Sequence, residues 1–223
     1  MIGLDQNRYT GDMVKIFTNS EGLYDGDLCF YAKTVFKAPN THHGYHGLSH
    51  MLHVTWVCYK AIQYYARLGQ INMRGRRNLL IAGLFHDYDH TGGIGDDSTN
   101  ISRAITGMKE KLLASDVGYT EDISQIIRAT QFPHTNLGTR ETLEQTIIRD
   151  ADMSQVLSAT WIGVILTGFG SEQGKSPLEM LEQQLKFLGT VKFHSDFGKV
   201  FFGEQAIQAK VEETRGLLTI LKN

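Results

Sequence analysis

Apolar residues recur at helical spacing along most of this 223-residue chain. The longest run covers about residues 45–68, where apolar side chains share one predicted helix face: Leu48, Leu52, Trp56, Tyr59, Ile62 and Ala66. A repeat of about 3.6 residues marks an amphipathic helix, and continuous strand-like alternation is hard to find. The pattern therefore predicts an all-α fold of about seven to nine helices.

Shorter helices are predicted on both sides of this run, from apolar spacing and helix-end signals. Their ranges are 11–18, 28–36, 76–87, 100–113, 120–132, a segment capped by Thr139 that bends near Asp150 and continues as a buried helix over 150–169, a segment capped by Ser176, and 204–221. Gly69 is a suitable stop for the long helix. The run Ser176–Glu179 combines a serine cap, a proline in the first turn and a glutamate at the third position. Ser98 or Thr99 is the expected cap of the 100–113 helix.

Composition and charge are those of a globular protein, with 41% hydrophobic residues and a net charge of −2. We expect residues 1–223 to form a single domain. A nearly neutral chain gives no reason to expect nucleic acid or an anionic membrane as partner. The stretch 156–169 is too short and too rich in Ser, Thr and Gly to span a bilayer. The basic cluster at Arg74, Arg76 and Arg77 is predicted to lie in a solvated loop, with the steering of a phosphate group as the alternative.

The two cysteines, Cys29 and Cys58, are too few for a disulfide framework, and both have apolar neighbours. We expect reduced core thiols in a cytoplasmic protein. The N-terminal residues show no basic region followed by an apolar one, the pattern of a signal peptide. The oligomeric state stays open.

Metal-binding side chains crowd the stretch Phe85–Gly93, immediately after an apolar run. Histidines stand at positions 86 and 90, aspartates at 87 and 89, and glycines follow. Burying charge at the end of an apolar helix is costly unless a partner or a cation neutralises it. Imidazole and carboxylate groups are ligands for divalent metals. We therefore predict that the rest of the chain folds to bring further ligands to this stretch.

Two other segments carry such ligands. In the predicted 45–68 helix, His46 and His50 are four positions apart, which would place them on one face. Asp150 and Asp152 stand at the predicted start of the 150–169 helix, where acidic residues complement the helix dipole. That complementarity accounts for Asp150, whereas Asp152 is followed by apolar residues and needs a partner. Both segments therefore offer ligands to the His-Asp pair.

The order of these residues resembles the HD superfamily of metal-dependent phosphohydrolases. Three motifs are similar to the catalytic core of class I cyclic-nucleotide phosphodiesterases: Tyr45-His46-x-x-x-His50, His86-Asp87-x-Asp89-His90-x-Gly92 and Ala151-Asp152-Met153-Ser154. The resemblance covers about residues 45–154. It implies a compact multi-helix domain of the HD or phosphodiesterase type, with a metal centre between helices.

The resemblance also implies roles for the matching residues. His50, His86, Asp87 and Asp152 would be the metal ligands, and Asp87 would bridge to a second ion held largely by water. In the same comparison His46 would be the proton donor, with His90 beside it and Asp89 orienting ring nitrogens. The cofactor would be two divalent ions, either Zn²⁺, Mg²⁺, Mn²⁺ or Fe²⁺.

Candidate substrate contacts follow from the same resemblance. They are Tyr45, Asn100, His134 and Gln173. Asn100 matches an asparagine that follows the family's His-Asp motif, and Gln173 is a candidate for its purine-selecting glutamine. His134 is expected to line the pocket, with a second-metal ligand or a loop histidine as alternatives. Candidates for the family's aromatic clamp are Phe197, Phe201 and Phe202.

One position departs from the motif, because Gly47 stands where the family has an asparagine. The expected activity is hydrolysis of a phosphodiester, most simply of a cyclic nucleotide, by a metal-activated hydroxide with a histidine general acid. Alternatives are a nucleotidase or nucleoside triphosphate phosphohydrolase, a di-iron oxygenase on the same fold, and a binding module without activity. The expected partner is a small-molecule nucleotide.

Overall fold

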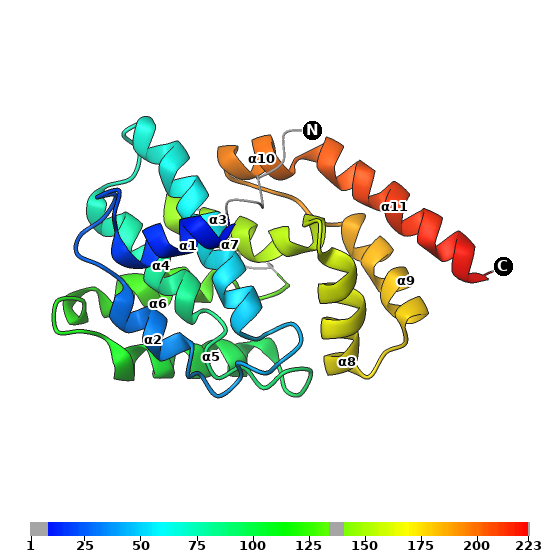
Figure 1. Cartoon of the computed structure of the whole chain (residues 1–223), viewed down its shortest axis with the longest axis horizontal. Coiled ribbons are helices and arrows are strands. Elements are labelled where there is room, and N and C mark those ends of the chain that lie inside the picture. Colours follow the sequence, from blue (N-terminus) through cyan, green and yellow to red (C-terminus); the bar gives the residue numbers. More distant parts are fainter. Residues whose placement is uncertain (1–8, 134–140, 223) are drawn as a thin grey trace.

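The protein is described by a computed structural model that covers residues 9–133 and 141–222. Within these ranges all regular structure is helical and no strand occurs, which confirms the predicted all-α class. Figure 1 shows the arrangement, with N-terminal and central helices on one side and a C-terminal group of helices projecting from them.

The helices have the following bounds: α1 Tyr9–Thr18, α2 Cys29–Val35, α3 Leu48–Arg67, α4 Met73–Phe85, α5 Asp97–Lys111, α6 Thr120–Arg128, α7 Leu143–Met153, α9 Pro177–Leu188, α10 Asp196–Phe202 and α11 Glu204–Lys222. The short α8 covers Gly170–Gln173, the π-helix η4 covers Ile162–Phe169, and 3₁₀ turns η2 and η3 cover Val117–Tyr119 and Ser154–Leu157. There are more elements than predicted, because the expected 150–169 helix is divided and the short α8 and α10 were not foreseen.

The core is built around α3 and α4, which pack along each other and receive α6 and α7. Helix α4 is buried continuously from Arg77 to Phe85, as the apolar run predicts. Full burial of one leucine side chain there stabilises the fold by about 2 kcal/mol. Gly69, with φ of 67°, follows the end of α3 as predicted. The polar stretch after Phe85 therefore follows directly from a buried helix that is packed against α3.

Three expected helix starts differ from the structure. Helix α3 begins at Leu48, not near Tyr45, and α5 is capped by Asp96, whose carboxylate accepts the backbone N–H of Thr99. The proposed Thr139 cap lies outside the described residues, and Thr142 caps α7 in a capping box with Gln145.

The expected 150–169 helix is wrong. Helix α7 ends at Met153, a 3₁₀ turn follows, and the chain then enters η4. Asp150 and Asp152 therefore lie at the end of α7, not at the start of a helix. Asp150 accepts hydrogen bonds from the backbone N–H groups of His194 and Ser195, so the helix start it supports is that of α10.

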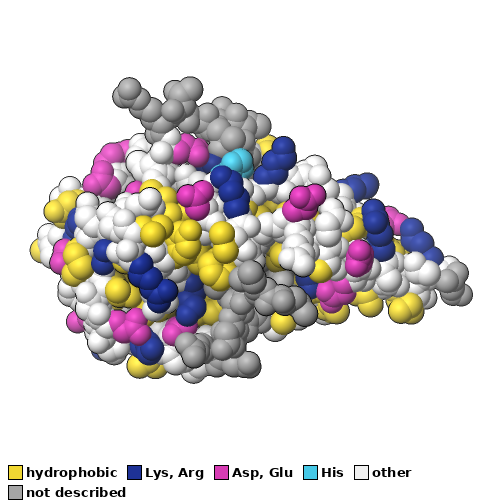
Figure 2. Space-filling view, turned by 90° about the horizontal axis from the view of Figure 1, so that it is seen from above, with side chains coloured by type: hydrophobic (Ala, Val, Ile, Leu, Met, Phe, Trp, Pro, Cys, Tyr) yellow, Lys and Arg dark blue, Asp and Glu magenta, His cyan; other side chains and the backbone are white. Residues whose placement is uncertain are grey.

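The C-terminal group consists of η4, α8, α9 and α11, with α9 packed against both η4 and α11. The predicted capping box at Ser176 is confirmed, as is the last helix. Among the described residues no single helix is long and apolar enough to cross a membrane; Leu143–Leu157 and Ile162–Gln173 meet that test only as a pair, bent by 94°. On the face shown in Figure 2, acidic and basic side chains are interspersed.

Candidate metal centre and adjoining pocket

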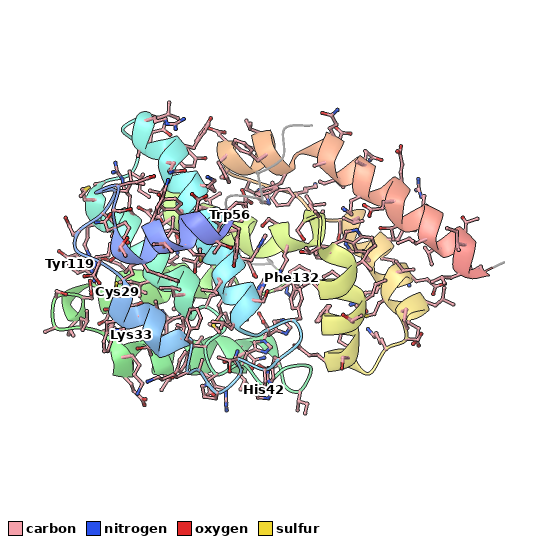
Figure 3. All side chains as sticks on the ribbon, in the orientation of Figure 1. Cys29, Lys33, His42, Trp56, Tyr119 and Phe132 are labelled. Carbon is pink, nitrogen blue, oxygen red and sulfur yellow. The ribbon has the colours of Figure 1, made fainter. Side chains whose placement is uncertain are left out.

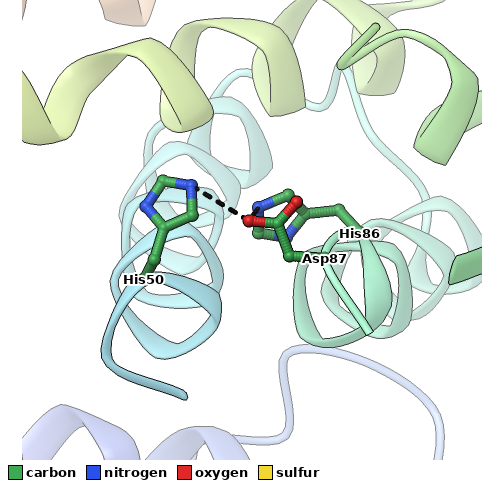
Figure 4. A group of neighbouring side chains, drawn as sticks. All are labelled: His50, His86 and Asp87. Atoms are coloured by element: carbon green, nitrogen blue, oxygen red, sulfur yellow. Dashed lines mark ion pairs between the residues drawn. The ribbon is translucent and has the colours of Figure 1, made fainter. Parts of the chain in front are cut away.

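Three separate helices bring four polar side chains to one point. His50 comes from α3, His86 and Asp87 follow the end of α4, and Asp152 lies at the end of α7. Figure 4 shows His50 facing the His86–Asp87 pair across a narrow gap. The predicted set of four ligands is thus brought together by the fold.

The distances between the four side chains suit a shared cation. The Asp87 Oδ2 atom lies 3.6 Å from His50 Nε2 and 3.5 Å from His86 Nε2. Asp152 Oδ1 lies 2.8 Å from His50 Nε2 and 3.7 Å from His86 Nε2. Ligand atoms about 2 Å from a metal lie about 3–4 Å from one another, so these separations need only small adjustment.

Both imidazoles are held so that Nε2 faces this point. His50 Nδ1 contacts the Gln155 side-chain oxygen at 2.5 Å, and His86 Nδ1 donates to the Gly83 carbonyl at 2.9 Å. Such contacts fix the ring tautomer and orientation of metal-binding histidines. Sequence reasoning missed the role of Gln155, which lies 105 positions from His50 in the chain.

Two buried atoms at this point have no hydrogen-bond partner within the described part of the chain: His86 Nε2 and Asp87 Oδ2. Leaving a buried polar group unpaired costs about 1–3 kcal/mol, and more for a charged one. Burial opposes charge on His50, but its hydrogen bond with Asp152 and the charge of Asp87 raise the pKa of His50 to about 9. The four residues thus attract positive charge, and two imidazoles with two carboxylates fit a divalent metal ion.

His46 stands beside this cluster, but on a loop. Because Gly47 is the N-cap of α3, His46 and His50 do not share a helix face, and their rings meet edge to face at 6.3 Å. The prediction of one shared helical face is therefore wrong, although His46 still lines the pocket next to Asp87.

The orientation of His46 is set by Glu172, in the short α8. One Glu172 oxygen accepts the backbone N–H groups of Tyr45 and His46, at 2.6 and 3.1 Å. The other lies 2.7 Å from His46 Nδ1, so Nε2 is the free nitrogen of that ring. Gly93 permits this approach, because a Cβ atom there would overlap the Glu172 carbonyl. Glu172 was not predicted, since nothing local marks it and 126 positions separate it from His46.

His90 stacks on His46, with ring centroids 3.9 Å apart and planes inclined by 13°. Its Nδ1 accepts the Gly92 backbone N–H at 3.0 Å. Burial, only partly offset by the charge of Asp87, lowers the pKa of His90 to about 4. The structure thus places a neutral imidazole against the His46 ring.

Asp89 does not orient a histidine ring, contrary to its predicted role. Its carboxylate pairs with Arg103, at 2.8 Å, on a different side of the turn from the pocket. Its backbone φ is 63°, a left-handed conformation that is uncommon for a side-chain-bearing residue. Asp89 therefore acts on the shape of the turn.

A pocket of about 570 Å³ opens over the cluster. Its floor includes Asp87 and Asp152, and its walls include Tyr45, Phe132 and Phe187. Figure 3 shows Phe132 between the core and the C-terminal helices, and its ring lies 6.2 Å from that of Phe187. Polar groups at the base of a largely apolar cleft are typical of a small-molecule site.

The described substrate candidates all line this pocket. Tyr45 stacks on His50 with centroids 4.7 Å apart. The side-chain oxygen of Asn100 accepts hydrogen bonds from Thr91, and that of Gln173 accepts one from Lys175. The remaining candidate, His134, lies outside the described residues.

Gln184, on α9, is a pocket residue that sequence reasoning missed. It is 3% exposed, and its Nε2 lacks a partner among the described residues. Phe187 follows one helical turn later on the same wall. The suggested aromatic clamp at Phe197, Phe201 and Phe202 is not part of this wall, because those residues belong to α10.

Comparison of the chain with protein-family models and with curated proteins gave no match in either case.

Proposed function

We propose that this chain is a metal-dependent phosphohydrolase of the HD type, acting on a phosphodiester. The observation that carries the proposal is a pair of buried atoms, His86 Nε2 and Asp87 Oδ2, that have no hydrogen-bond partner among the described residues and face His50 and Asp152 below a pocket. An uncompensated buried carboxylate is unfavourable unless a cation joins it.

In this proposal His50, His86, Asp87 and Asp152 would hold the divalent ions. Divalent ions bound there supply Lewis-acid activation of water and neutralise charge on a phosphoryl group. The chain itself orients these ligands through Gln155 and the Gly83 carbonyl. Burial on α3 and α4 keeps bulk water from competing for them.

His46 is the proposed general acid. Glu172 holds its Nδ1 and leaves Nε2 directed away from that carboxylate, available to give a proton to the leaving oxygen. The stacked His90 ring limits rotation of His46. A general acid at a fixed position contributes about 10²–10⁴-fold to rate when the leaving group is poor.

A nucleotide is the proposed substrate. The aromatic side chains of Phe132 and Phe187 offer faces for a base, and the Gln184 amide offers unpaired hydrogen-bonding capacity next to them. A cyclic nucleotide places its diester toward the cluster while its base occupies this wall. Since Cys29 and Cys58 are both free thiols, we propose a cytoplasmic setting.

The test is hydrolysis of a panel of cyclic nucleotides, linear diesters, and nucleoside mono- and triphosphates, with Mn²⁺, Mg²⁺, Zn²⁺ or Fe²⁺ supplied. His46→Ala should keep bound metal and lose turnover on diesters with poor leaving groups. Full activity of His46→Ala on such a diester would remove the acid assignment.

The same panel separates the alternatives. Cleavage of mono- or triphosphates alone would identify a nucleotidase. Bound iron with oxygen consumption and no phosphate release would favour an oxygenase. A purified protein that takes up no metal at micromolar supply would favour a binding module.

A further inference from the structure

The side chain of Asn40 joins the two catalytic segments through backbone groups. It is 1% exposed and lies just before the loop that carries His46. Its Nδ2 donates to the carbonyl of His46 at 2.6 Å and to the carbonyl of Asp87 at 2.7 Å. Its Oδ1 accepts the backbone N–H of Asp89 at 2.9 Å.

These contacts use both donor hydrogens of the amide and one acceptor position. No other side-chain type of this size supplies two donors and an acceptor in one plane. Both linked segments are otherwise irregular, since one precedes α3 and the other follows α4. Asn40 is therefore a side chain that hydrogen-bonds to the backbones of both His46 and Asp87 and so fixes their separation directly.

The loop that presents Asn40 is itself folded back tightly. The Asn40 carbonyl accepts the backbone N–H of His43 at 3.0 Å. Gly47 lies against this turn so closely that a Cβ atom there would overlap the His43 carbonyl. The position after His46 thus has no room for a side chain, and the amide that braces the loop comes from Asn40 instead.

On its far side the His-Asp turn is held by Arg103. Its Nε donates to the Asp89 carbonyl at 2.7 Å and its Nη2 pairs with the carboxylate at 2.8 Å. Arg103 and Asn40 together hold Asp89 in its left-handed conformation. Arg103 does not contact His46, whereas Asn40 does, so Asn40 joins the backbones of the two segments, and the stacked rings of His46 and His90 join their side chains.

We infer that Asn40 is a positioning residue that sets the distance of the general acid His46 from the metal ligand Asp87. The inference rests on the proposed phosphohydrolase function. Asn40 does not line the pocket, so it acts through the two backbones and not on substrate. A displacement of about 1 Å in a catalytic group is enough to cost about 10²-fold in rate.

The test compares leaving groups in the full-length, metal-loaded protein. Asn40→Asp keeps the shape of the side chain and the oxygen that accepts from Asp89. It replaces the donor NH₂ group by a carboxylate oxygen that faces the carbonyls of His46 and Asp87. Asn40→Ser removes the amide without adding charge. We expect each variant to lose about 100-fold in kcat on a diester with an alkyl leaving oxygen. On a p-nitrophenyl diester, whose leaving group needs little protonation, we expect a loss of about tenfold or less.

Mn²⁺ binding, measured by titration calorimetry, should change less than about threefold in Asn40→Ser, because all four ligand side chains remain. The matched control is Asn78→Ser, in the middle of α4. Asn78 is also buried, and its side-chain oxygen accepts from Arg74. The Asn78→Ser substitution should lower thermal stability about as much as Asn40→Ser does. It should leave unchanged the ratio of the rates on the alkyl and p-nitrophenyl diesters.

Equal losses on both diesters in Asn40→Asp and Asn40→Ser would overturn the inference, as would a selective loss in Asn78→Ser. If the unchanged protein hydrolyses neither diester, the proposed function has failed. If it hydrolyses both and the Asn40 variants keep its rate ratio, only the positioning role has failed.

Discussion

Charged side chains are buried near both ends of helix α4, but they differ in how fully protein hydrogen bonds pair them. At its N-terminal end Arg77 pairs with Asp116 through two contacts, at 2.8 and 2.7 Å, and Arg74 adds a third at 2.6 Å. Tyr31 donates its hydroxyl to the same carboxylate at 2.7 Å. At the C-terminal end, the carboxylate Oδ2 of Asp87 has no hydrogen-bond partner among the described residues.

This difference separates a charge cluster whose carboxylate is paired by protein groups from the cluster that we propose binds a metal ion. Around Asp116, protein donors meet the buried charge, so the cluster is complete without any other species. Around Asp87, the atoms His86 Nε2 and Asp87 Oδ2 lack a hydrogen-bond partner among the described residues, which suits the cation that we propose binds there. Burial alone, which the two clusters share, does not distinguish their roles.

The largest expected effect is that of Asp87→Asn on activity. Loss of the carboxylate should remove metal binding and lower kcat/KM by more than about 1000-fold. In the presence of a chelator the thermal midpoint should change little, because the Asp87 Oδ2 atom has no hydrogen-bond partner among the described residues to lose. Calorimetric Mn²⁺ titration and thermal scans measure both effects. A large fall in the midpoint would mean that Asp87 is structural, like Asp116.

Asp116→Ala should give the reverse result. It leaves Arg77 buried without its anion, which destabilises a fold by about 3–5 kcal/mol. Urea unfolding measures this loss. Activity per folded molecule and Mn²⁺ affinity should be unchanged at low temperature. A selective loss of metal binding would contradict the division between the two ends of α4.

Gln184→Leu extends the comparison to a third site. The Gln184 Nε2 atom, like Asp87 Oδ2, is buried without a hydrogen-bond partner among the described residues. Removing an amide whose Nε2 is unpaired should not lower stability, because no protein hydrogen bond is lost there. The KM for a nucleotide substrate should rise about tenfold, with kcat changed little. The neighbouring Gln183→Leu, on the same helix and also in the pocket wall, is the matched control. Equal effects of the two substitutions would remove the specific role of Gln184.

The smallest expected effect is a pH dependence of stability. Burial opposes ionisation of Asp116, but hydrogen bonds from Arg77, Tyr31 and Arg74 hold its pKa well below its usual value. A lowered folded-state pKa gives stability that is present above about pH 4 and declines as pH falls toward the folded pKa. Between pH 5 and 3, Asp116 should account for about 1 kcal/mol of lost unfolding free energy. Between pH 5 and 3, the urea midpoint should fall less steeply in Asp116→Ala than in the unchanged protein. An equal fall in both proteins would mean that other carboxylates cause this pH dependence.

The basic cluster at Arg74, Arg76 and Arg77 shows why local sequence misleads for charge. A solvated loop was predicted, yet these residues form the first turns of α4, and Arg77 is 4% exposed. Its partner Asp116 lies 39 positions away, so no local pattern announces the pairing. Arg76 likewise donates to backbone carbonyls of Ile71 and Leu23.

The sequence by itself determined the all-α class, most helix positions and the set of four candidate ligands. Helix periodicity and end signals are local, because the hydrogen bonds of a helix join residues four apart. The ligand set was readable because His86 and Asp87 end an apolar run, and because His50 and Asp152 matched a known order of motifs. These statements need no knowledge of how the helices pack.

Only the tertiary structure decided how the site is completed. It moved His46 off α3, joined it to Glu172, paired Asp89 with Arg103, and placed Gln184 in the pocket wall. Each of these depends on a contact between segments far apart in the chain or on a close backbone approach at a glycine. Such contacts are selected by the packing of the whole molecule, and a local pattern of residues carries no record of them.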